Sequence, residues 1–115
     1  MNTASVDRMF RAFSDRTRLR ILHLLKDQGE ICVGDLVSVL RVPQTTVSRH
    51  LAYLRRAGLV RVRKDGLWKY YALARPESVF HRKLLACLAD CFTEVRELAM
   101  DRRRYRSIKR CCPPD

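Results

Sequence analysis

The side chains of this sequence that are best suited to chemistry are those of its five cysteines. They are Cys32, Cys87, Cys91, Cys111 and Cys112. Their thiolates can bind soft metal or metalloid ions, or can be oxidised to disulfides. The first ten residues, MNTASVDRMF, include an acidic side chain and no long apolar run, so we expect no export signal and a reducing, cytoplasmic location. Reduced thiols serve as ligands, as redox sensors or as ordinary core residues.

Four of the cysteines form two close pairs. Cys87 and Cys91 are four residues apart in a helical pattern, which places them within reach of a shared ion, although both also fit an apolar helix interface. Cys111 and Cys112 are adjacent in a polar tail, where they add little to a core and where neighbouring basic residues favour the thiolate form. We expect Cys91, Cys111 and Cys112, together with Cys87, to bind a soft ion as the tail folds back onto the last helix.

A second kind of chemistry is indicated by the polar side chains that follow Pro43. Residues 44–57 carry apolar side chains at helical spacing, and the rest of this helix carries groups that donate and accept hydrogen bonds. Such groups can read the edges of bases in the major groove of DNA. The expected base-reading residues are Gln44, Thr45, Thr46, Ser48, Arg49 and His50.

The charge of the chain also favours nucleic acid as a partner. Lys and Arg number 24 against 12 acidic residues, which gives a net charge of +12. Residues 49–75 alone hold eight basic side chains and one acidic side chain, a concentration suited to binding phosphates. No segment approaches the roughly 20 apolar residues that a membrane-spanning helix requires, so we expect no membrane partner. The expected phosphate-binding residues are Arg61, Arg63, Lys64 and Lys69.

The spacing of apolar residues predicts the elements that position these groups. A chain of 115 residues is expected to form one domain. Four short helices are predicted over 6–13, 17–26, 31–40 and 44–57, then a β-hairpin over 60–73 and a long helix over 76–100. The expected fold class is mainly α (α+β), a winged helix-turn-helix with about five helices and one two-stranded β-hairpin wing. Residues 1–100 are expected to form the DNA-binding and dimerisation domain, and residues 101–115 a basic flexible tail.

Four segments of the sequence resemble a known family. The stretches AFSDRTRLRILHLL, EICVGDLV, QTTVSRHLAYLRRAGLV and RKDGLWKYYAL are similar, in order and spacing, to the ArsR/SmtB family of bacterial metal-responsive repressors, and especially to its arsenic-responsive branch. The resemblance covers residues 6–73. It implies a repressor, not an enzyme. The repressor would form a homodimer through its first and last helices, bind double-stranded operator DNA, and leave the DNA when an inducer binds.

The resemblance also bears on the inducer. Arsenite-responsive relatives often carry Cys-Val-Cys-Asp-Leu at the start of the third helix, whereas this chain has Gly34 at the position of the second cysteine. Cys32 is therefore expected to be a small buried residue. Sulfur ligands in a chain with only three histidines favour As(III) or Sb(III) as the inducer, with zinc less favoured. The alternative is a thiol redox or persulfide-sensing repressor of the same family.

Overall fold

The computed structural model describes residues 1–111. Among these residues, none of the helices is both long enough and apolar enough to cross a membrane. The elements, in chain order, are α1 (Thr3–Phe13), α2 (Arg16–Gln28), β1 (Glu30–Cys32), α3 (Val33–Leu40), α4 (Gln44–Arg56), β2 (Val60–Asp65), β3 (Trp68–Leu73), α5 (Val79–Asp90) and α6 (Arg96–Ser107).

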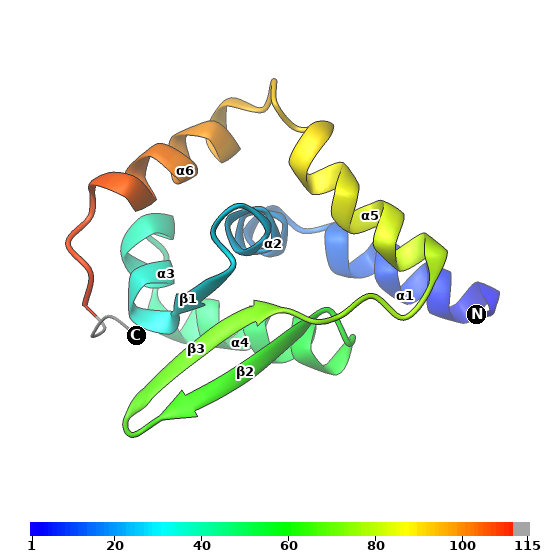
Figure 1. Ribbon diagram of the computed structural model, residues 1–115, viewed down its shortest axis with the longest axis horizontal. Helices are drawn as coiled ribbons and strands as arrows, with labels where there is room; N and C mark the ends of the chain where they lie inside the picture. Colours follow the sequence, from blue (N-terminus) through cyan, green and yellow to red (C-terminus); the bar gives the residue numbers. More distant parts are fainter. Residues whose placement is uncertain (112–115) are drawn as a thin grey trace.

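Helix α2 is the centre of the fold, and α3, α5 and α6 surround it (Figure 1). The Asp15 carboxylate caps its first turn by accepting a hydrogen bond of 3.0 Å from the Arg18 backbone N–H. Gly29, whose positive φ of 89° suits glycine, ends it. The residues from position 20 to position 25 are all buried, so this helix presents apolar side chains in several directions. It is therefore the element against which the others pack.

Helices α3 and α4 form a helix-turn-helix. Arg41 adopts a left-handed conformation with a φ of 55°, and Pro43 follows before α4 begins. On α4, Val47, Leu51 and Leu54 are fully buried at three- and four-residue spacing. This stripe fixes α4 against the core and leaves its other side toward solvent.

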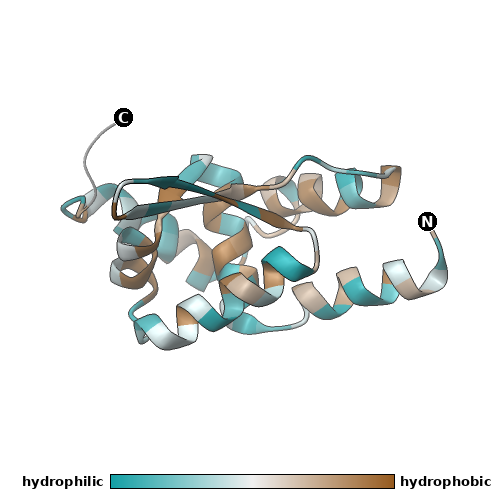
Figure 2. Cartoon of the chain, turned by 90° about the horizontal axis from the view of Figure 1, so that it is seen from below, coloured by the Kyte–Doolittle hydropathy of each residue, from teal (hydrophilic) through white to brown (hydrophobic). Residues whose placement is uncertain are grey.

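The strands form one antiparallel sheet in the order β1-β3-β2. The β2–β3 hairpin pairs Val60 with Leu73 at its base and Asp65 with Trp68 at its tip. Figure 2 shows a hydrophilic outer half and a more hydrophobic base. The sequence predicted this hairpin but not the third strand, β1, because three residues are too few to display an alternating pattern.

The last part of the chain differs from the single helix that was predicted. Helix α5 ends at Asp90, and a turn separates it from α6. Helix α6 then crosses residue 100, the expected start of the flexible tail, and buries Asp101 and Tyr105. The ion pair between Asp101 and Arg20 gives a physical reason, because it attaches α6 to α2 instead of continuing the line of α5.

Candidate nucleic-acid interface and sulfur site

One side of α4 is exposed and rich in hydrogen-bonding groups. Gln44, Thr45, Ser48 and Arg49 are all exposed there, and they lie on the side of the helix away from its buried stripe. These are four of the six residues predicted to read bases. Their side chains can donate to and accept from base edges, because none of them is used in packing.

A groove of about 910 Å³ separates α4 from the hairpin. Its cationic lining comes from Arg55 and Arg56 at the end of α4 and from Lys69 on β3, and no acidic side chain of residues 1–111 lines it. Gln44 and Ser48 reach it from the first half of α4. The groove therefore joins hydrogen-bonding and cationic groups on one surface, which is the combination that a DNA duplex requires.

Two predicted residues on α4 are less accessible. Thr46 is half-buried. The His50 ring faces the start of α2, where its Nε2 lies 3.8 Å from the Asp15 carboxylate and its Nδ1 lies 3.5 Å from the Arg18 guanidinium. Burial lowers the pKa of His50.

The predicted cations of the hairpin lie on different surfaces. Lys64 and Lys69 are exposed at the outer half. Across the hairpin, Arg61 pairs with Ala72 and Arg63 pairs with Tyr70. Of the three residues of β3 that line the groove, Trp68 lies at the tip, and Lys69 and Tyr71 point to the other face of the hairpin from Tyr70 and Ala72. Arg61 and Arg63 therefore belong to the face opposite this groove. Arg63 is also bound to the Glu30 carboxylate at 2.6 Å.

Three residues of this surface were not among the predicted DNA contacts. Arg55 and Arg56 line the groove, and Leu67 at the tip of the hairpin is 99% exposed. Arg56 follows Ser48 by two helical steps of four residues and therefore lies on the same face of α4. This spacing could have identified Arg56 from the sequence. No apolar pattern could have marked Leu67, because it is a single residue in a turn.

The second candidate site brings together sulfur atoms from distant parts of the sequence. The Sγ of Cys111 lies 3.9 Å from the Sγ of Cys32, which ends β1. Both the backbone N–H and the Sγ–H of Cys111 donate to Asp35 Oδ1, at 3.0 and 3.1 Å. One potential ligand atom from each of these three residues falls within 4.8 Å of the others. Burial and then the Asp35 carboxylate raise the pKa of the Cys111 thiol.

Gly34 makes room for this arrangement. A Cβ atom at position 34 would lie 2.3 Å from the Cys111 Sγ, which is far too close for two non-bonded atoms. The sulfur of Cys111 therefore occupies the space that a side chain at position 34 would fill. Cys32, which was expected to be only a small buried residue, is indeed buried but is also part of this cluster. It is engaged in a disulfide in this structure.

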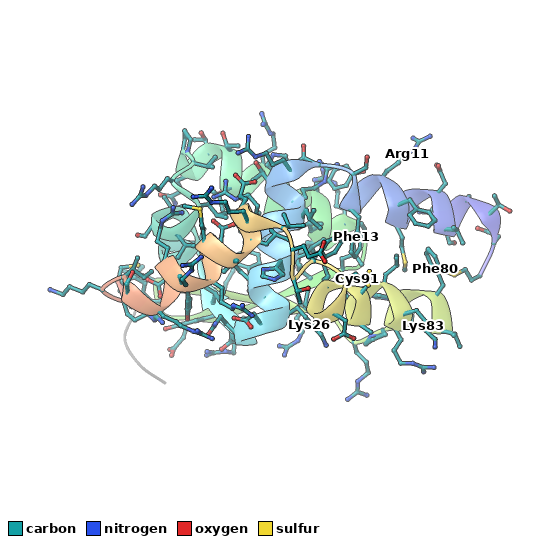
Figure 3. All side chains as sticks on the ribbon, turned by 90° about the horizontal axis from the view of Figure 1, so that it is seen from above. Arg11, Phe13, Lys26, Phe80, Lys83 and Cys91 are labelled. Carbon is teal, nitrogen blue, oxygen red and sulfur yellow. The ribbon has the colours of Figure 1, made fainter. Side chains whose placement is uncertain are left out.

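The other cysteines of the expected ligand set lie elsewhere. Cys87 and Cys91 are free thiols on α5 and at its C-terminal end, hydrogen-bonded to one another, and this bond raises the pKa of Cys87. Cys91 is labelled in Figure 3, and α5 lies on the opposite side of α2 from α3 (Figure 1). The structure thus brings Cys111 to Cys32 and not to this pair. Cys112 lies outside the described residues.

Helix α6 connects the sulfur site to α3. Arg104 donates to the Val39 carbonyl at 2.6 Å, and Arg20 donates to the Leu40 carbonyl at 3.1 Å. Arg20 is itself held by the buried Asp101 carboxylate at 2.8 and 2.9 Å. These bonds satisfy carbonyl groups in the last turn of α3, while Cys111 binds Asp35 in its first turn. The end of the chain therefore contacts α3 at both of its ends.

The comparisons with known proteins agree with this geometry. The family described as "Bacterial regulatory protein, arsR family" matches residues 15–62. An HTH-type transcriptional regulator of Methanocaldococcus jannaschii is 48% identical over 63 residues, which cover 55% of this chain and 71% of that protein. The arsenical resistance operon repressor of Escherichia coli is 47% identical over 66 residues, 57% of this chain but only 56% of the repressor's own length.

Solved structures extend the similarity beyond the helix-turn-helix. HlyU from Vibrio cholerae superposes with a TM-score of 0.70 at 35% identity, over 79% of this chain and 95% of that one. A homodimeric winged helix-turn-helix domain from Mycobacterium bovis superposes with a TM-score of 0.66 at 33% identity, over 79% of this chain and 81% of that one. The predicted fold class, a mainly α winged helix-turn-helix, is thereby confirmed.

Proposed function

Because the chain belongs to the ArsR/SmtB family of transcriptional regulators, a class without enzymatic activity, we propose that it represses transcription by binding operator DNA as a homodimer. We further propose that a thiophilic ion bound by Cys32 and Cys111 releases the DNA. The single observation that carries this second part is the position of the Cys111 sulfur in the space above Gly34.

DNA binding is supported by the surface formed by α4 and the hairpin. In this proposal α4 enters the major groove, Gln44, Thr45, Ser48 and Arg49 contact base edges, and Lys64 and Lys69 contact phosphates. Two copies of α4 in a symmetric dimer would then contact half-sites about 34 Å apart, one turn of the duplex.

The dimer interface is proposed on α1 and α5. These helices lie side by side (Figure 3). The rings of Phe10 and Phe80 meet edge to face between them, with centroids 5.2 Å apart. Phe10 remains 54% exposed and Val79 61% exposed, so the pair presents apolar surface that a second copy could cover.

The inducer site is supported by its donor atoms. Two sulfurs and one carboxylate oxygen suit a soft or borderline ion, with Asp35 as the oxygen donor. Of the residues expected from the sequence, Cys111 is retained and Cys32 is added, while Cys112 lies outside the described residues and stays a predicted ligand. The ion would need the reduced protein, because the sulfur of Cys32 cannot bind an ion while it is part of a disulfide.

Release of DNA would follow from the contacts of α3. An ion that draws Cys111 toward Cys32 would replace the hydrogen bond from the Cys111 thiol to Asp35, in the first turn of α3. Because α3 packs against α4, a small rotation of α3 would move the base-reading surface. A tenfold loss of DNA affinity needs only about 1.4 kcal/mol of difference between the two conformations, within the usual range of allosteric coupling.

Fluorescence anisotropy tests the proposal directly. The reduced protein is bound to labelled DNA from its own promoter at fixed salt, and arsenite, antimonite, cadmium, zinc and hydrogen peroxide are titrated in parallel. Release by arsenite or antimonite at lower concentrations than by cadmium or zinc would support a metalloid inducer. The opposite order would assign a divalent ion, and no release by any ion would refute an ion-responsive repressor.

A redox switch is the second candidate. The disulfide of Cys32 favours it, and Cys111, which is not its partner, offers a thiol 3.9 Å from the Cys32 sulfur. In this case two thiols would transfer two electrons and two protons to hydrogen peroxide, giving one disulfide and two waters. Release by peroxide without any ion, reversed by dithiothreitol, would establish this alternative.

A further inference from the structure

A basic hollow lies at the base of the hairpin, between the end of β3 and α5. It has a volume of about 690 Å³ and is lined by four cationic side chains over an apolar floor that includes Leu73 and Leu85. The four cations are Lys26, Arg61, Arg75 and Arg82. A second, smaller hollow shares Lys26, Arg61 and Leu73 with the first, extends toward the end of α2 and is also lined by Glu30.

The four cations have no acidic partner among residues 1–111. No aspartate or glutamate lines the larger hollow. The acidic side chains closest in sequence to Lys26 are engaged elsewhere, since Asp27 lies 3.8 Å from Arg102 and Glu30 binds Arg63. All four cations are exposed, whereas most of the buried or half-buried arginines among the described residues do have such partners, as Arg20 has Asp101. The positive charge of this hollow is therefore not neutralised by the fold.

The cations come from four separate elements that converge on one place. Lys26 lies in the last turn of α2, Arg61 on β2, Arg75 in the connection from β3 to α5, and Arg82 in the first turns of α5. Figure 3 shows Lys26 beside α5. The N-terminal turns of a helix carry partial positive charge, so the start of α5 adds to the attraction for an anion.

We propose that this hollow binds the phosphate groups of a small polyphosphorylated molecule. Two or more phosphates would satisfy four cations, and the apolar floor would contact the uncharged part of the ligand. Phosphates of DNA share this chemistry, but among the described residues no part of α4 lines the hollow, so we assign it to a free ligand. This inference is independent of the inducer site, which lies beside α3.

Calorimetric titration of the full chain with pyrophosphate, with ATP and with AMP tests the assignment. The ionic strength is kept constant near 0.15 M, so that general attraction between a cationic protein and any anion is screened. We expect pyrophosphate and ATP to bind with one site per chain and AMP to bind at least tenfold more weakly. Equal affinity for all three, or no saturable binding, would overturn the proposal.

A matched pair of double variants separates a local site from general charge. Arg75→Ala with Arg82→Ala removes two cations of the hollow, and Arg103→Ala with Arg106→Ala removes two exposed cations of α6. All four side chains are exposed, so both variants are expected to fold. The first should weaken pyrophosphate binding at least tenfold and the second less than twofold. Equal weakening in both would overturn the assignment.

A DNA-binding experiment distinguishes a free phosphorylated ligand from the phosphates of DNA. Both variants are compared on short promoter duplexes and on the same duplexes extended at both ends. Loss of affinity for the extended DNA only, with no pyrophosphate binding in the unaltered protein, would assign the hollow to flanking DNA and refute the free ligand. Promoter binding and ion-induced release test the proposed function separately, and either can fail without affecting pyrophosphate binding.

Discussion

The sulfur atoms of Cys32 and Cys111 lie 3.9 Å apart although 79 positions separate the two residues in the sequence. Cys32 ends a short strand, and Cys111 reaches it after α6 has passed along α2 and α3. Gly34 permits the approach because it has no Cβ. The chain thus obtains two adjacent sulfurs at α3 from two distant segments.

Substitution of Cys111 should separate sensing from DNA binding. In Cys111→Ser the hydroxyl can still donate to Asp35, so the fold and the operator affinity should be retained. Release by the ion should need at least tenfold more of it. The matched control is Cys91→Ser, an exposed thiol outside the cluster, which should respond as the unaltered protein does. Loss of release in Cys91→Ser alone would instead assign the site to α5.

Gly34→Ala should weaken ion binding without removing a cysteine. The added Cβ would lie 2.3 Å from the Cys111 Sγ and must displace it. We expect at least a tenfold loss of ion affinity, measured by competition with a chromophoric chelator, and unchanged helicity. Ser38→Ala, an exposed position of the same helix, is the control and should bind the ion normally. Normal ion binding in Gly34→Ala would show that Cys111 is not a ligand.

Breaking the buried ion pair of Arg20 and Asp101 should destabilise the fold more than replacing both residues by apolar ones. Arg20→Met leaves the Asp101 carboxylate, 1% exposed, without its main cation, and should lower the free energy of unfolding by about 3–5 kcal/mol. Arg20→Met combined with Asp101→Leu removes both charges and should recover most of the loss. Urea denaturation measures all three proteins, and a double variant as unstable as the single one would contradict this account.

Substitutions of base-reading and of phosphate-binding residues should change the salt dependence of DNA binding differently. Gln44→Ala should reduce the preference for operator over unrelated DNA, by about 1–3 kcal/mol if the side chain contacts a base in bidentate fashion. Lys69→Ala should weaken binding to every DNA similarly and reduce the slope of log K against log salt by about 1. Anisotropy at several salt concentrations measures both. If Gln44→Ala weakened binding to operator and unrelated DNA equally, its assignment to base reading would be wrong.

Mild acid should destabilise the fold through buried histidines. Burial lowers the pKa of His81, and the nearby Glu77 only partly opposes this effect. Its Nδ1 accepts the Glu77 backbone N–H at 3.3 Å, so the folded protein favours the neutral ring. The stabilisation is therefore complete above the unfolded pKa near 6.5 and is lost as the pH falls through the lowered folded pKa. Urea denaturation at pH 7.5 and 5.5 should show the loss, and His81→Asn should make it smaller.

The sequence was sufficient to predict the helix-turn-helix and the hairpin, because their signals are local. Val47, Leu51 and Leu54 mark one face of α4, and the Asp65-Gly66 turn marks the hairpin. The break between α5 and α6 could not be predicted in this way. The apolar pattern continues past Cys91, and the reason for the break is the attachment of Asp101 to Arg20, a contact between residues 81 positions apart.

The sulfur site could not be predicted from local sequence patterns, for the same reason. Cys111 was recognised as a candidate ligand from its polar surroundings, but its neighbour in space depends on where α6 ends. Gly34 was noted only as a missing cysteine, whereas in the structure the absence of its side chain makes room for Cys111.

The contacts of α3 with the end of the chain also bear on how the protein is made. The last-turn carbonyls of α3 are capped by Arg104 and by Arg20, whose partner Asp101 is in α6 as well. During synthesis from the N-terminus the Val39 carbonyl stays without its cap, and Arg20 stays without Asp101, until α6 has left the ribosome. The surface proposed to read DNA therefore matures only after α6 has been made, and a chain that stops before α6 is expected to bind DNA poorly.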